Sequence, residues 1–139
     1  MLIISDYPPT PQGRPRVTKF VTYDPTAPQK KQFLKSIINQ LPKKPLTKPI
    51  ALRLLFKIKR PKSHYNSKGE LKPTASFLPD KRPDLDNYIK FVLDALNGIL
   101  YKDDAQIVII FAKKKYADHS GIEIRIKELH KNSDCISNR

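Results

Sequence analysis

The spacing of hydrophobic residues changes along this chain, and the change restricts the folds that the chain can adopt. In residues 49–61, apolar and basic residues alternate, which is typical of a half-buried strand with one basic face. Between Leu85 and Leu96 the apolar residues recur every three to four positions, which predicts an amphipathic helix that ends at Gly98. A chain that mixes these two periods favours a sheet covered by helices.

The remaining segments extend this pattern to the order strand, helix, strand, helix, strand, strand. The predicted strands are residues 1–5, 49–61, 105–118 and 120–129, and the predicted helices are residues 29–41 and 86–97. We expect the last two strands to form a hairpin with its turn near residues 118–121. Residues 7–28 and 63–83 predict long loops, the first with a short strand near residues 17–23. The predicted fold is an α+β domain with one mixed sheet and two main helices.

The length of 139 residues is that of a single domain, which we place at residues 1–130, followed by a polar tail at 131–139. Cys135 lies in this tail and can form neither a disulfide framework nor a zinc site by itself. The longest apolar run, residues 107–112, is too short to span a membrane, and the N-terminus lacks a signal-peptide pattern. We therefore expect a cytoplasmic protein without a membrane partner.

The charge of the chain is strongly positive, because 27 Lys and Arg oppose 13 Asp and Glu, for a net charge of +14. Nucleic acid is the expected partner, since neutralising phosphates releases counterions and provides affinity. DNA contacts are predicted for basic residues in the loops, namely Arg14, Arg16, Lys19, Lys72, Lys81 and Arg82. Each of these residues can equally be a solubilising charge.

Five of the 13 acidic residues interrupt this basic background between residues 84 and 104. Asp84 precedes the predicted helix and Asp86 opens its first turn, so their carboxylates are expected to converge. Asp103 and Asp104 come at the start of the next strand, after a short connection that would return them toward the same end of the sheet. Carboxylates without His or Cys partners are the ligand set preferred by Mg²⁺, or by Mn²⁺ in its place.

Each of these residues also has an ordinary structural interpretation. Asp84 or Asp86 alone would be a helix cap, which contributes about 1 kcal/mol to stability. Lys90 would form an ion pair with Asp86, worth roughly 0.3–0.5 kcal/mol. Asp94 lies on the outer face of the helix, and we expect it to be solvated and outside the site. Capping requires one carboxylate and does not explain four around one helix, whose mutual repulsion favours a bound cation.

Residues 81–107, KRPDLDNYIKFVLDALNGILYKDDAQI, resemble the signature of the RusA family of Holliday junction resolvases. The resemblance rests on a D-x-D-N motif, a lysine in the same helix, the sequence LDALNG, and D-D-x-Q at the next strand. The GRPR sequence near the start and the GELKP loop are compatible with phage-type members. The resemblance implies a homodimeric, Mg²⁺-dependent endodeoxyribonuclease that makes paired nicks in four-way DNA junctions during recombination and repair.

The same resemblance implies roles for individual residues. Asp84, Asp86 and Asp104 would hold one or two Mg²⁺ ions, with Asp103 as an auxiliary acid. Lys90 would be catalytic, either stabilising charge in the transition state or assisting the leaving 3′ oxygen. Two alternatives stay open, namely a non-catalytic basic nucleic-acid-binding module and a metal nuclease that acts on other branched DNA.

A homodimer is also expected from the residues themselves. A single domain with one acidic cluster has one active site, whereas resolving a four-way junction requires two nicks related by two-fold symmetry. Residues 107–112 are apolar on both faces of their predicted strand, so each face needs a cover. The helices or a second subunit would provide these covers.

Overall fold

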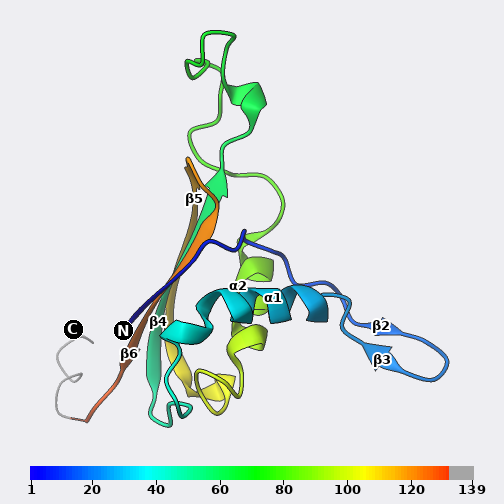
Figure 1. The fold of residues 1–139 in the computed structure, drawn as a ribbon, viewed down its shortest axis with the longest axis vertical. Helices are drawn as coiled ribbons and strands as arrows, with labels where there is room; N and C mark the ends of the chain where they lie inside the picture. The colour runs from blue at the N-terminus through cyan, green and yellow to red at the C-terminus, as the bar shows by residue number, and fades with distance from the viewer. Residues whose placement is uncertain (132–139) are drawn as a thin grey trace.

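A four-stranded mixed sheet forms the body of the computed structural model, which describes residues 1–131 (Figure 1). Across the sheet the order is β1 (Leu2–Ser5), β6 (Gly121–Glu128), β4 (Ile50–Lys59) and β5 (Ile107–Ala117). Strand β4 pairs in parallel with β5 and antiparallel with β6, which pairs antiparallel with β1. The predicted α+β class with a mixed sheet is confirmed. Residues 132–139, including Cys135 and most of the predicted tail, lie outside the described residues.

The hairpin predicted for the last two strands is wrong, because β4 lies between β5 and β6. The chain leaves β5 at Ala117, crosses the end of β4 through residues 118–120 and returns as β6. At this crossing the Ser120 Oγ accepts a hydrogen bond from the backbone N–H of Lys59, at 3.3 Å. Alternating hydrophobicity indicates which face a strand buries and not which strand lies beside it, so the pattern did not reveal the order.

Two helices, α1 (Ala27–Ile37) and α2 (Leu85–Leu96), cover one face of the sheet (Figure 1). Helix α2 spans the predicted periodic residues, whereas α1 gives way to a 3₁₀ turn, η1 (Ile38–Gln40), before its predicted end. The helices and the sheet share one core, which includes Phe33, Ile37, Phe91, Val92, Leu52, Leu54, Phe56, Ile122 and Ile124. Burying each of these large side chains contributes about 1.5–3 kcal/mol, so the helices are held mainly by packing.

The opposite face of the sheet has no helix on it within residues 1–131. Strand β5 is an edge strand on which Val108, Ile109, Ile110 and Phe111 are each 40% to 60% exposed. Helix α2 therefore covers this strand only in part. The two helices do not provide the covers that an apolar strand of this kind requires.

Two segments project from the body of the molecule (Figure 1). Strands β2 (Arg16–Val17) and β3 (Thr22–Tyr23) form a short antiparallel hairpin beyond the start of α1. The loop between β4 and α2, which contains the 3₁₀ turn η2 (Lys62–His64), extends past the end of the sheet. Within the described part of the chain, no helix has the length and apolar character that crossing a bilayer requires.

Candidate active site

The first acidic pair lies at the start of α2. Asp84 occupies the N-cap position with an extended backbone (φ −71°, ψ 146°), and its side chain makes no capping hydrogen bond. Asp86 follows in the first turn, and both side chains are exposed. The ordinary interpretation of Asp84 as a helix cap is therefore not observed, and its carboxylate remains available to an external ligand.

The backbone around this pair is fixed by contacts from distant parts of the chain. Lys114 of β5 donates hydrogen bonds through Nζ to the carbonyl oxygens of Lys81 (2.8 Å) and Pro83 (2.9 Å). The backbone N–H of Gln12 donates to the carbonyl oxygen of Asn87 in the first turn of α2, at 3.0 Å. Sequence reasoning missed both contacts, because the acceptors are backbone carbonyls that any residue provides.

The second acidic pair follows α2 and begins a 3₁₀ turn, η3 (Asp104–Gln106). Asp103 caps this turn, since its carboxylate accepts from the backbone N–H of Ala105 (3.1 Å), and this hydrogen bond lowers the pKa of Asp103. The Gln106 side chain accepts in return from the backbone N–H of Asp103, at 2.9 Å. The side-chain hydrogen bond with Asp103 raises the pKa of Asp104, and the negative charges of Asp103 and Asp94 act in the same direction. A cation beside Asp104 would relieve this repulsion.

The two pairs lie at opposite ends of α2, so the expected convergence does not occur within one chain. Asp104 begins the 3₁₀ turn that directly precedes β5, whereas the Asp84 end of α2 lies against Lys114, seven residues beyond the first residue of that strand. At about 3.3 Å per residue, this part of the strand alone spans about 23 Å. Among residues 1–131, no three Asp, Glu, His or Cys side chains are grouped closely enough to hold a metal ion.

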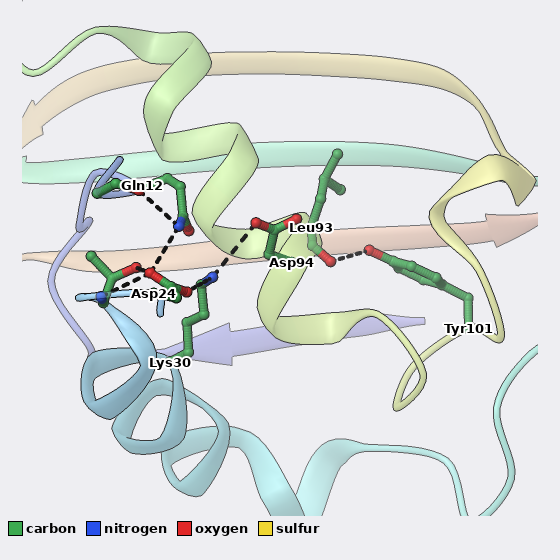
Figure 2. A network of polar contacts seen from close by, with 8 residues as sticks. Gln12, Asp24, Lys30, Leu93, Asp94 and Tyr101 are labelled. Carbon is green, nitrogen blue, oxygen red and sulfur yellow. Dashed lines mark hydrogen bonds and ion pairs between the residues drawn. The ribbon is translucent and has the colours of Figure 1, made fainter. Parts of the chain in front are cut away.

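Lys90 lies on α2 one turn after Asp86, and its side chain is exposed. The ion pair between these two residues that a purely structural role predicts is absent from the described part of the chain. Asp94, expected to be solvated, also pairs with Lys30 of α1 at 3.5 Å (Figure 2). Asp94 is exposed, as expected, and the sequence did not reveal its contact with Lys30 because it does not show that α1 packs beside α2.

Lys30 belongs to a polar network centred on Asp24 (Figure 2). Asp24 accepts hydrogen bonds from Lys30, from the Thr26 hydroxyl (2.6 Å) and from the Gln12 side-chain amide (3.1 Å). Burial alone raises the pKa of Asp24, but these hydrogen bonds outweigh it and hold the pKa well below its ordinary range. The network therefore joins the segment before α1 to both helices.

The six basic residues predicted to contact DNA fall into two groups, and all six are exposed. Arg14, Arg16 and Lys19 belong to the β2–β3 hairpin and the residues just before it. Lys72, Lys81 and Arg82 belong to the loop between β4 and α2, and the last two lie immediately before the Asp84 turn. Lys81 and Arg82 thus adjoin the first acidic pair in the chain, whereas the hairpin group is linked to it only through the contact of Gln12 with Asn87.

A family model described as Endodeoxyribonuclease RusA matches residues 6–127. The chain is also 35% identical over 129 residues to an uncharacterized protein, YqaN, of Bacillus subtilis (strain 168), with 87% of this chain and 91% of the relative covered. The chain therefore belongs to the RusA endodeoxyribonuclease family. The resemblance seen in residues 81–107 extends over nearly the whole chain, and the prediction that the protein is an endodeoxyribonuclease is confirmed.

Proposed function

We propose that the protein is a Mg²⁺-dependent resolvase that makes paired nicks in four-way DNA junctions, in recombination and repair within the cytoplasm. The family match carries this proposal. The exposed Asp84 carboxylate, which makes no capping hydrogen bond and follows Lys81 and Arg82 in the chain, is the feature that agrees with it. The alternative, a non-catalytic binding module, predicts DNA binding that is independent of Mg²⁺ and no cleavage.

The chemistry of the acidic residues fits a hard divalent cation. Asp84, Asp86 and Asp104 provide only carboxylate oxygens, the donors that Mg²⁺ and Mn²⁺ prefer. When bound, such a cation acts as a Lewis acid and lowers the pKa of a bound water. One chain, however, keeps Asp104 apart from the other two residues. The metal site is therefore completed by a second copy of the chain.

We propose that this second copy binds along the outer edge of β5, where no strand pairs in the described residues. Antiparallel pairing of two β5 edges about a two-fold axis near Ile109 would cover the exposed apolar residues. It would also place the start of one strand beside the Lys114 end of the other. Asp104 of one subunit would thus approach Asp84 and Asp86 of the partner subunit, and the dimer would carry two identical sites.

The remaining residues of the site act on the DNA itself. Lys90, exposed on the same helix as Asp86, either neutralises charge on the scissile phosphate or assists the leaving 3′ oxygen. Lys81 and Arg82 bind phosphates next to the acidic pair. Lys114 is a positioning residue, because it holds the backbone that carries Asp84.

Mixing two inactive variants tests the function and the shared site together. Asp84→Asn and Asp104→Asn are each expected to be inactive on a four-way junction with Mg²⁺. In a mixed dimer with shared sites, one site carries both substitutions and the other carries neither. With random subunit exchange, half of the dimers are mixed, so about a quarter of all sites should be active. Each mixed dimer should then make a single nick in a junction.

A matched control is the mixture of Asp84→Asn with Asp86→Asn, in which every shared site remains damaged and no nicking should return. If the mixture of Asp84→Asn with Asp104→Asn makes no nicks although subunit exchange is verified, all three acids of a site would belong to the same chain. A panel of four-way, forked, flapped and linear DNAs, with and without Mg²⁺, tests the substrate. Equal cleavage of every branched form would contradict the junction preference.

A further inference from the structure

The tip of the β2–β3 hairpin exposes apolar side chains, and the Lys19 Nζ lies over the Phe20 ring, 5.9 Å from its centroid. Thr18 closes the turn, because its backbone N–H (2.8 Å) and its hydroxyl (2.9 Å) both donate to the Val21 carbonyl. Lys19 and Phe20 are therefore at the apex, where the Phe20 side chain is 86% exposed. Val17 and Val21 beside it are 78% and 59% exposed. Exposed apolar surface on a projection is typical of an interaction site.

The charge around this tip indicates the class of partner. Residues 7–23 contain Arg14, Arg16 and Lys19 and no acidic residue. A partner that matches both features combines negative charge with a flat apolar surface, as unpaired DNA bases and their phosphates do. The same basic tip on a second copy of this chain would bring like charges together and is electrostatically a poor match for this hairpin.

The base of the hairpin is anchored beside the first acidic pair. The backbone N–H of Gln12 donates to Asn87, the residue after Asp86. The Gln12 side chain also donates to Asp24, which binds Lys30 of α1 (Figure 2). These contacts hold both strands of the hairpin base to the two helices, so its direction relative to Asp86 is set.

Close packing at Gly13 strengthens this anchor. A Cβ atom at Gly13 would lie 2.9 Å from Pro25 Cγ and 3.0 Å from Thr26 Cγ2. These distances leave no room for a larger residue, so the two chain segments that lead into the hairpin are in direct contact. The hairpin is therefore a short projection on a firm base rather than an extension of a loose loop.

We propose that this hairpin probes the DNA for unpaired bases at the branch point. Arg14, Arg16 and Lys19 bind phosphates on either side of that point, and Phe20 stacks on a base that the branch leaves unpaired. Duplex bases are already stacked on their neighbours, so this contact favours branched over linear DNA. The inference rests on the proposed junction-cleaving function and assigns part of its substrate preference to Phe20.

The chain contains no tryptophan, so a tryptophan placed at the tip is a specific reporter. We expect the fluorescence of Phe20→Trp to be quenched by a saturating four-way junction in EDTA, and less by a linear duplex. Ile38→Trp is the control, because Ile38 is 64% exposed beyond the opposite end of α1. Its fluorescence should not change, while the anisotropy of labelled DNA confirms that both variants bind.

A second measurement compares the affinities of Phe20→Ala and Phe20→Tyr. Loss of one stacking contact should weaken junction binding about ten-fold in Phe20→Ala, whereas Phe20→Tyr retains it. Junction binding without quenching of Phe20→Trp, or with equal quenching of Ile38→Trp, would overturn the proposal alone. Absence of DNA binding by anisotropy would overturn the proposed function as well. Fluorescence of Phe20→Trp that changes with protein concentration, without DNA, would assign the tip to a protein contact and overturn the proposal.

Discussion

The two acidic pairs at the ends of α2 lie in different electrostatic surroundings. Asp84 and Asp86 stand at the N-terminal end of the helix, where the helix dipole favours negative charge. Asp103 and Asp104 instead face each other, and the charge of Asp94 adds to a repulsion that raises the pKa of Asp104. A cation bound beside the second pair would relieve this repulsion.

The two pairs also differ in what holds them in place. The capping box between Asp103 and Gln106 positions the second pair within four consecutive residues. The first pair depends on contacts from Lys114 and Gln12, which are distant in the sequence. This difference teaches that the proposed site has one locally determined half and one half that requires the complete fold.

The largest expected effect comes from the first pair. Asp84→Asn should reduce junction nicking at least about 100-fold, because it removes a proposed metal ligand. Junction binding should stay equal or become tighter, since a negative charge near the phosphates is lost. Asp86→Asn is expected to behave in the same way. Nicking assays with Mg²⁺ and anisotropy without it provide the two readouts, and more than a few per cent residual nicking would remove Asp84 from the metal site.

A substitution at the centre of the β5 edge tests whether the two pairs meet between subunits. Ile109→Lys places a charge in the proposed interface, so light scattering at micromolar concentration should give 16.0 kDa rather than about twice that mass. Nicking should fall about ten-fold or more, because both shared sites are lost. Ile38→Lys, a similar change at an exposed position outside this edge, should leave mass and activity unchanged. A fully active Ile109→Lys monomer would contradict the shared site.

Two further substitutions distinguish the role of Asp103 from the role of Asp104. Asp104→Asn should abolish nicking if Asp104 completes the metal site. Asp103→Asn should reduce it only a few-fold, because Asn is as good a cap as Asp and preserves the turn. Equal loss of activity in both variants, with unchanged melting temperatures, would make Asp103 a ligand instead of an auxiliary acid.

A smaller effect is expected where the hairpin base meets the helices. Asp24→Asn weakens the network with Lys30 and should cost about 1 kcal/mol, or roughly 3–5 °C in melting temperature at pH 7. The folded state depresses the pKa of Asp24, so this stabilisation is present above the unfolded pKa near 4 and is lost as the pH falls further. The melting temperatures of the unsubstituted protein and of Asp24→Asn should therefore converge as the pH falls. Asp118→Asn, at an exposed turn, should leave the melting temperature unchanged at every pH. A difference in melting temperature between the unsubstituted protein and Asp24→Asn that stays constant down to pH 2 would contradict this role for Asp24.

Much of the fold could be predicted because its signals are local. The apolar period between Leu85 and Leu96 defined α2, and alternation in residues 50–59 defined the central strand. The motif in residues 81–107 identified the family, because its residues are nearly contiguous in the chain. These features depend on neighbours within one helix turn or one strand, which the sequence displays directly.

The amino-acid sequence by itself thus determined the α+β class, the position of α2 and the family to which the chain belongs. Only the tertiary structure decided that β4 separates β5 from β6, that Asp94 pairs with Lys30, and that Asp84 and Asp104 lie at opposite ends of α2. The physical reason is that strand order and direction are set by hydrogen bonds between backbone groups, which are the same for nearly every residue. The distance between two acids far apart in the chain follows from that order, so no local pattern records it.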